Sequence, residues 1–302
     1  LANRSDQLAP TPLESFDFPT EENRTAYCIY TSGSTGNPKG ILVSAKGLSN
    51  LVSANKELFG IAPGTRFLQF ASLNFDASVY EIFSTLCNGG TLALVDKKKV
   101  LPGEPLANFI RENAVTTICL PPSVIKGLMP FDLPALQNVI SAGESCPQQL
   151  AKVFNERGIA FFNAYGPTET TVCASIYRTN GYEEPVPIGS PMPQTRIYLL
   201  NADNEPVSKG EVGEMVVAGD CLLKGYANPE TTDTSAIIYD VCGEERLYKT
   251  GDFAYEDIKT GQLVFSGRKD NLVKIRGFRV ELGAIEQVLE SNSTVQNAVV
   301  KI

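Results

Sequence analysis

Apolar runs alternate with amphipathic stretches from residue 26 to about residue 164. The runs have the length and apolar content of buried strands, and the stretches between them have helical periodicity. The pattern predicts strands at 67–70, 91–95, 116–120, 138–141 and 160–164, and helices at 45–59, 77–87, 105–113 and 147–157. Alternating strands and helices predict an α/β fold in which helices cover a mostly parallel sheet.

The pattern changes after Pro185 to short apolar runs between frequent Gly and Pro turns. Strands are predicted at 196–200, 214–218 and 263–266, and a helical segment returns only at 282–289. The chain therefore predicts an α/β part followed by a β-rich part.

Residues 30–40 (YTSGSTGNPKG) form a Gly- and hydroxyl-rich loop between the apolar runs 26–29 and 41–43. Gly33 and Gly36 let backbone N–H groups converge on an anion, the hydroxyls add donors, and Lys39 adds positive charge. A flexible turn has the same composition, so the loop alone leaves both interpretations open. A Walker P-loop does not fit, because Pro38 precedes Lys39 and Gly40 follows it.

Composition narrows the possible functions. The 302 residues are 43% hydrophobic, enough for a substantial core, and the net charge of −8 disfavours nucleic acid as a partner. The chain has no histidine, which excludes Ser-His-Asp and Cys-His catalysis and His-ligated metals. Its seven cysteines form no CxxC pair, so a reducing cytoplasm is expected. No stretch predicts a membrane span or a signal peptide, so no membrane partner is expected.

Three further motifs follow the loop in a specific order: residues 163–171 (NAYGPTETT), 248–252 (YKTGD) and 266–277 (SGRKDNLVKIRG). A fourth, residues 75–81 (FDASVYE), lies between the loop and these three. In this order they resemble the adenylate-forming (AMP-binding) superfamily, and most closely the amino-acid adenylation domains of nonribosomal peptide synthetases. The resemblance covers nearly the whole chain from Thr25 onwards.

The resemblance implies an ATP-dependent amino-acid ligase. The amino acid attacks the α-phosphate of ATP, pyrophosphate leaves, and the aminoacyl adenylate passes to the phosphopantetheine thiol of a carrier domain. It further implies Mg²⁺, an amino-acid substrate, and a carrier and a condensation domain in the parent chain; a monomer is expected. The alternatives are a nucleotide- or amino-acid-binding core without turnover, and an acyl-CoA ligase-like or reductase-linked adenylating enzyme.

The resemblance also assigns roles to nucleotide-site residues. Glu169 is expected to hold Mg²⁺, Tyr165 to stack on adenine, Asn163 to read the base edge and Asp252 to bind both ribose hydroxyls. Phe265 stands where relatives often carry Tyr, so one polar contact with the nucleotide is expected to be missing. The expected catalytic set is Thr31, Lys39, Glu169 and Arg268. The expected nucleotide-binding set is Ser32, Gly33, Ser34, Thr35, Gly36, Asn163, Tyr165, Gly166, Thr168, Asp252, Phe265 and Lys274.

The resemblance predicts where the parts of the chain divide. Residues 1–184 are expected to be the α/β part of a large N-terminal subdomain whose first segment is missing, and 185–269 its β-rich part. Asp270 matches the family's hinge, so 270–302 are expected to begin a small C-terminal α+β subdomain. The family's late catalytic lysine has no counterpart before Ile302, so this piece is expected to turn over weakly or not at all.

The amino-acid pocket is argued partly from residue chemistry. On a helix, Asp76 and Tyr80 can face one pocket, and relatives that use α-amino acids place an aspartate here to pair with the ammonium group. Asp76 as a helix N-cap is the alternative. The remaining expected pocket residues carry no charge, which favours an apolar or aromatic side chain such as that of phenylalanine. The full expected set is Asp76, Ala77, Tyr80, Cys119, Ile140, Ala142, Ala164, Val172 and Cys173.

Overall fold

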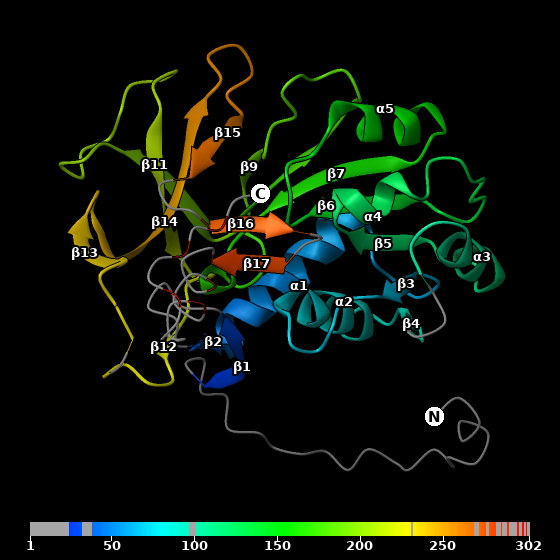
Figure 1. The fold of residues 1–302 in the computed structure, drawn as a ribbon, viewed down its shortest axis with the longest axis horizontal. Coiled ribbons are helices and arrows are strands. Elements are labelled where there is room, and N and C mark those ends of the chain that lie inside the picture. The colour runs from blue at the N-terminus through cyan, green and yellow to red at the C-terminus, as the bar shows by residue number, and fades with distance from the viewer. Residues whose placement is uncertain are drawn as a thin grey trace.

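The computed structural model describes residues 24–31, 38–96, 101–230 and 232–268, two later strands, and residues 285, 289, 295, 298 and 300. A seven-stranded sheet occupies the α/β part, with strand order β4-β3-β5-β6-β7-β8-β9 (Figure 1). The strands from β4 to β7 in this order are parallel, whereas β8 and β9 are antiparallel to their neighbours. Their bounds are β3 (Arg66–Gln69), β4 (Thr91–Leu94), β5 (Thr117–Leu120), β6 (Asn138–Ala142), β7 (Ala160–Tyr165), β8 (Ser175–Arg178) and β9 (Ser190–Pro191).

Helices cover both faces of this sheet. The helices are α1 (Ala45–Phe59), α2 (Asp76–Leu86), α3 (Glu104–Glu112), α4 (Pro122–Lys126) and α5 (Gln148–Glu156). Apolar residues of α3, α4 and α5 form one core cluster with Val139 and Phe161 of the sheet. Apolar residues of α1 and α2 form a second cluster with Ile140 and Phe162. Successive residues of a strand point to opposite faces of the sheet. Val139 and Phe161 therefore face the first core cluster, and Ile140 and Phe162 face the second.

Local chemistry sets the ends of α1. Ser44 caps the helix by accepting the N–H of Gly47 at 3.0 Å. Gly60 ends the helix in the left-handed region at φ 65°, a conformation that glycine adopts without a Cβ clash. The helix therefore runs between two signals that can be read in the sequence.

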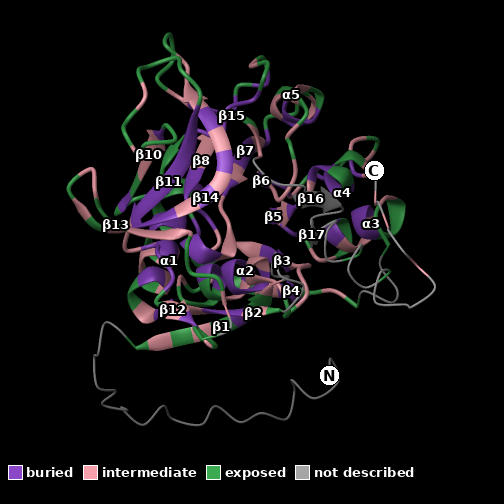
Figure 2. Cartoon of the chain, turned by 60° about the vertical axis from the view of Figure 1, so that its left-hand side comes forward, coloured by how far each residue is buried: buried purple, intermediate pink, exposed green. Residues whose placement is uncertain are grey.

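Antiparallel sheets make up the rest of the described chain. A five-stranded sheet contains β10 (Thr195–Leu200), β11 (Gly213–Gly219), β13 (Ile237–Val241), β14 (Glu244–Glu256) and β15 (Leu263–Arg268). A smaller sheet joins β1 (Thr25–Thr31), β2 (Lys39–Ser44) and β12 (Gly225–Tyr226), and β16 (Leu272–Ile275) pairs with β17 (Phe278–Glu281). Figure 2 shows buried residues concentrated along the strands and on the inward sides of the helices.

The predicted α/β fold and its mostly parallel sheet are confirmed. The nine strands and helices predicted in the α/β part appear within two residues of the expected bounds. The sequence pattern did not predict α4 or the antiparallel strands β8 and β9. A five-residue helix such as α4 and a two-residue strand such as β9 are too short to show periodicity. The helix expected at 282–289 lies outside the described residues except at 285 and 289.

Candidate functional site

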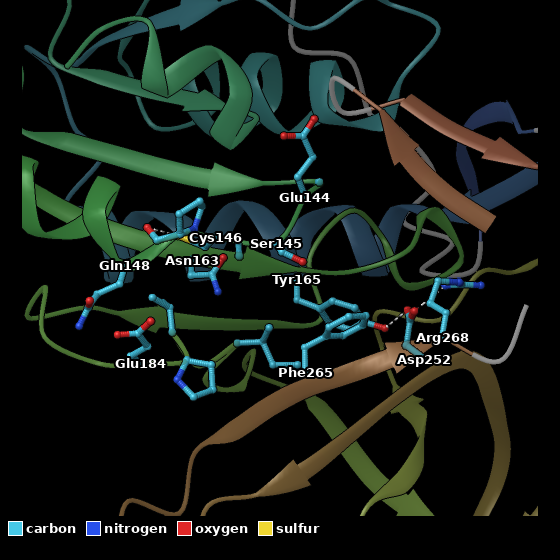
Figure 3. A pocket seen from close by; sticks show the side chains of 16 residues that line it. Glu144, Ser145, Cys146, Gln148, Asn163, Tyr165, Glu184, Asp252, Phe265 and Arg268 are labelled. Atoms are coloured by element: carbon cyan, nitrogen blue, oxygen red, sulfur yellow. Dashed lines mark hydrogen bonds and ion pairs between the residues drawn. The ribbon is translucent and has the colours of Figure 1, made fainter. Parts of the chain in front are cut away.

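A pocket of about 580 Å³ opens at the carboxyl end of the parallel strands (Figure 3). Open α/β sheets place their ligands at this edge. Strands β7, β14 and β15, the connection after β6 and the segment before β9 supply its walls. The lining residues include Gly143, Glu144, Ser145, Cys146, Asn163, Ala164, Tyr165, Glu184, Asp252, Phe265 and Arg268.

Asp252 is the polar centre of one end of the pocket. Its Oδ2 accepts a hydrogen bond from the Tyr165 hydroxyl at 2.6 Å, and its Oδ1 pairs with Nη1 of Arg268 at 2.6 Å. Burial, followed by the neighbouring Asp252 carboxylate, raises the pKa of Tyr165 well above its ordinary value. The phenol therefore stays protonated and donates. The structure brings together Tyr165, Asp252 and Arg268, three residues that the sequence assigned to the nucleotide site.

Aromatic and amide side chains line the same pocket. The Phe265 ring lies beside the Tyr165 ring, with centroids 6.5 Å apart and planes inclined by 40°. Asn163 Nδ2 donates to the carbonyl of Pro187 at 2.8 Å, which fixes the orientation of the amide group. Flat rings beside a fixed amide suit a planar, polar ligand such as a nucleobase.

Glu169 and Lys39 form a second polar feature. Nζ of Lys39 lies 2.6 Å from Oε1 of Glu169, whose side chain is fully buried. The same ammonium lies 5.5 Å from the ring centroid of Tyr226. In the hairpin of β1 and β2, Lys39 is the cross-strand partner of Thr31, whose buried hydroxyl has no hydrogen-bond partner among the described residues. The predicted loop residues Ser32, Gly33, Ser34, Thr35 and Gly36 lie outside the described residues.

The turn after β7 places Glu169. A short 3₁₀ helix, Thr168–Thr170, carries this residue, and its carbonyl accepts the N–H of Leu223 at 2.7 Å. At Gly166 a Cβ atom would lie 2.6 Å from the carbonyl oxygen of Val172, so a larger residue does not fit there. The sequence predicts Gly166 as a nucleotide contact, and this stays a prediction; the structure gives a steric reason for glycine at this position.

The predicted amino-acid pocket falls at the second core cluster. Six of its positions belong to this cluster or pack against it: Tyr80, Cys119, Ile140, Ala164, Val172 and Cys173. Asp76 and Ala77 begin α2 one turn before Tyr80, and Ala142 is the strand partner of Ala164. The pKa of Cys119 is raised chiefly by burial, and Asp76 is among the charges that add to the shift. The expected residues therefore lie near one another, around Ala164.

The alternative role for Asp76, as a helix N-cap, does not match the structure. Phe75 occupies the N-cap position of α2, and no side chain caps this end of the helix. Asp76 is the first helical residue, where a carboxylate still interacts favourably with the helix dipole.

Sequence reasoning missed some residues that shape the site. Glu81, fully buried, accepts the backbone N–H groups of Phe70 and Ala71, at 3.1 and 3.0 Å, and so fixes the connection that leads into α2. The sequence signal for Glu81 was its position as the last residue of the motif 75–81. Tyr27 is partly buried, and its pKa is raised chiefly by desolvation of its side chain and further by Asp76. No sequence signal links Tyr27 with Asp76.

Besides the loop residues 32–36, two further predicted residues are not placed with their side chains. Asp270 lies outside the described residues, and Lys274 falls in β16, whose side chains are not described. Within the described ranges, no group of three or more His, Cys, Asp or Glu side chains could hold a metal ion. Across the same part of the chain, no helix is both long enough and apolar enough to span a membrane.

Comparison with known proteins identifies the family. The AMP-binding enzyme family matches residues 3–227. The chain belongs to this family. Among its relatives, bacitracin synthase 3 of Bacillus licheniformis is 47% identical over 97% of the chain, and a linear gramicidin synthase of Brevibacillus parabrevis is 41% identical over 98%. The chain spans 5% and 4% of the lengths of these two relatives.

Solved structures of adenylation domains share the fold of this AMP-binding chain. The Vibrio cholerae adenylation domain AlmE, in complex with glycyl-adenosine-5′-phosphate, matches with a TM-score of 0.83 and 30% identity, over 93% of this chain and 55% of that protein. NpsA–ThdA, an artificially fused adenylation–PCP di-domain from Klebsiella oxytoca, matches with a TM-score of 0.82 and 29% identity, over 95% and 59% of the respective chains. These likenesses agree with the resemblance drawn from the motifs.

Proposed function

We propose that the chain is the core of an amino-acid adenylation domain of a peptide synthetase. It binds ATP in the pocket around Tyr165 and Asp252 and an α-amino acid at the cluster around Tyr80. The amino-acid carboxylate attacks the α-phosphate, forming aminoacyl-AMP and releasing pyrophosphate. The similar AlmE structure, which holds a glycyl adenylate, supports an aminoacyl adenylate as the product.

The position of Ala164 is the observation that carries this proposal. Ala164 lines the 580 Å³ pocket and also packs against the apolar cluster that contains Tyr80. The two ligands would therefore approach each other at this residue, near the carboxyl end of β7. An adenylating enzyme needs this meeting of two sites, because it must hold the carboxylate close to the α-phosphate.

Each nucleotide group has a matching partner. Asp252 suits two neighbouring ribose hydroxyls because a carboxylate has two acceptor oxygens, and Tyr165 and Phe265 offer rings to adenine. Thr168 is proposed to donate towards the α-phosphate. Thr31 and Lys39, at the two ends of the 32–37 loop, are proposed to face the β- and γ-phosphates, and Arg268 the ribose and phosphate side.

Mg²⁺ fits the residues present through Glu169. A buried carboxylate such as that of Glu169 suits a hard divalent ion, which is usually held by one or two carboxylates together with substrate phosphates. When bound, Mg²⁺ would neutralise phosphate charge. Lys39 holds the Glu169 carboxylate in place, and its ammonium is proposed to turn to the phosphates when nucleotide is present.

The amino-acid side chain is proposed to be apolar or aromatic. Asp76 pairs with the α-ammonium group, and the residues of the cluster around Tyr80 carry no other charge where the side chain would lie. Burial of an apolar side chain there is favoured at roughly 25 cal/mol per Å², and a charged side chain would be left without a partner. Phenylalanine is the proposed substrate.

The larger assembly is also a proposal. The aminoacyl group is passed to the phosphopantetheine thiol of a carrier domain, with a condensation domain in the same parent chain. The similar NpsA–ThdA structure, in which adenylation and PCP domains are fused, supports a carrier partner. Asp270 is proposed as the hinge between residues 1–269 and 270–302, with Lys274 approaching the nucleotide after rotation.

Amino-acid-dependent ATP–pyrophosphate exchange tests the proposal. The full-length domain in its parent chain is assayed with a panel of amino acids, and exchange is expected with phenylalanine or a similar apolar amino acid. In parallel, calorimetry measures binding of Mg-ATP and phenylalanine to residues 1–302. Exchange with none of the amino acids would contradict the proposed function. Binding of both ligands without exchange would favour a binding core without turnover.

A further inference from the structure

The Tyr165 hydroxyl performs a task that stacking does not require. A ring that only stacks on a base needs no polar group, yet this hydroxyl donates to Oδ2 of Asp252 at 2.6 Å. Both residues are buried, with 7% of Tyr165 and 3% of Asp252 exposed. Figure 3 shows the hydroxyl pointing along the pocket floor to the carboxylate, with Arg268 on the other side.

The two donors together fix the Asp252 carboxylate. Arg268 pairs with Oδ1 at 2.6 Å while Tyr165 donates to Oδ2, so a rotation of the carboxylate would break one bond or the other. Each carboxylate oxygen can accept two hydrogen bonds, and among the described residues each accepts one. One acceptor site therefore remains on each oxygen, at a fixed spacing.

We propose that Tyr165 is a positioning residue for the recognition of a vicinal diol. By holding Asp252 with Arg268, its hydroxyl selects ribonucleotides over deoxyribonucleotides, because two fixed acceptors are satisfied only by two adjacent hydroxyl groups. This inference rests on the proposed nucleotide site and adds sugar selectivity to it. The raised pKa of Tyr165 keeps the hydroxyl a donor throughout the neutral range.

Tyr165→Phe removes the hydroxyl and keeps the ring. Calorimetry measures the affinities of AMP and 2′-deoxy-AMP for residues 1–302 and for this variant. The unaltered chain is expected to prefer AMP at least about tenfold, since an unpaired buried acceptor is costly. In the variant, AMP affinity is expected to fall about tenfold while 2′-deoxy-AMP affinity changes less than about threefold, so the preference largely disappears.

Phe265→Leu is the matched control, because it alters the wall of the same pocket without touching Asp252. It is expected to weaken both nucleotides by the same factor and to leave the preference for AMP intact. Equal losses for both nucleotides in Tyr165→Phe, or no loss, would overturn the positioning role. Failure of the unaltered chain to bind either nucleotide would instead overturn the proposed function, and this inference with it. Melting temperatures of all three proteins identify any variant that fails to fold.

Discussion

At the level of single residues, two buried carboxylates each face a cation that is distant in sequence. Glu169 pairs with Lys39 and Asp252 with Arg268, both at 2.6 Å. A charge removed from water is retained in a folded protein when a partner compensates it. Both pairs lie among the residues expected to contact nucleotide, so the chain holds these acidic groups in place before a ligand arrives.

Lys39→Met is expected to destabilise the protein. It leaves the Glu169 carboxylate, which is fully buried, without its ammonium partner, and such losses cost about 3 kcal/mol. Lys46→Met is the control, because its pair with Asp220 is half exposed and is expected to contribute less than about 1 kcal/mol. Urea unfolding measures both. If the double variant Lys39→Met/Glu169→Gln regains stability, the buried charge explains the loss. Equal stabilities of Lys39→Met and Lys46→Met would contradict this explanation.

Asp76→Ala is expected to weaken amino-acid binding about 100-fold and to leave ATP binding unchanged, because the α-ammonium group loses its charged partner. Calorimetry with phenylalanine and with Mg-ATP gives the two affinities separately. Asp132→Ala removes an exposed charge elsewhere and is expected to change neither affinity. Loss of ATP binding in Asp76→Ala would show that Asp76 has a structural role instead.

Among the secondary-structure elements, the turn after β7 connects the two proposed ligand sites. Within a few residues, the end of β7 and this turn carry Tyr165 of the proposed nucleotide site, Glu169, and Val172 and Cys173 of the proposed amino-acid site. Thr171 and Val172 adopt positive φ values of 53° and 69°, which most residues avoid. The backbone here is therefore set by packing against neighbouring segments, not by local preference.

Gly166→Ala tests this packing. The added Cβ would lie 2.6 Å from the Val172 carbonyl oxygen and 2.7 Å from the Ala174 nitrogen, so the turn must shift, at a cost of about 2–3 kcal/mol. Gly225→Ala is the control, because nothing lies within 4 Å of its added Cβ. It is expected to be neutral or slightly stabilising. If urea unfolding shows Gly166→Ala to be as stable as Gly225→Ala, the backbone of the turn can shift at little energetic cost, which would contradict the packing argument.

For the molecule as a whole, burial sets the response to alkaline pH. Burial raises the pKa of Cys173 to about 12 and that of Cys221 to about 11. The unfolded chain ionises these thiols near pH 9 while the folded chain keeps them protonated. Their contribution to stability is therefore full below pH 8 and is lost as pH rises through 9 and above.

The free energy of unfolding is accordingly expected to fall by about 1–2 kcal/mol for each of these thiols between pH 8 and pH 10. Urea unfolding at half-unit steps measures the profile under reducing conditions. Cys173→Ala removes one of these thiols, so the decrease in the free energy of unfolding is expected to be smaller by about 1–2 kcal/mol. A flat profile across this range, or an unchanged slope in Cys173→Ala, would contradict the burial argument.

The order of residues along the chain was enough to locate most elements and the chemistry they carry. Apolar periodicity located the strands from β3 to β7 and the longer helices, because side-chain burial imposes a period on each kind of element. Ordered motifs, through their resemblance to the adenylate-forming superfamily, predicted Tyr165, Glu169, Asp252 and Arg268 as nucleotide-site residues, and these roles stay predictions. Short elements such as α4 and β9 were missed, because they contain too few residues for a period.

Which of these residues meet was settled by tertiary packing alone. The Tyr165 hydroxyl and Asp252 are 87 positions apart, and Lys39 and Glu169 are 130 apart, yet each pair makes a contact of 2.6 Å. Ala164 joins the two proposed sites because it lies at the carboxyl end of β7, where it lines the pocket and packs against the cluster around Tyr80. Such meetings follow from sheet order and from the packing of one sheet against another, which local sequence does not encode because the contacts are made between distant segments.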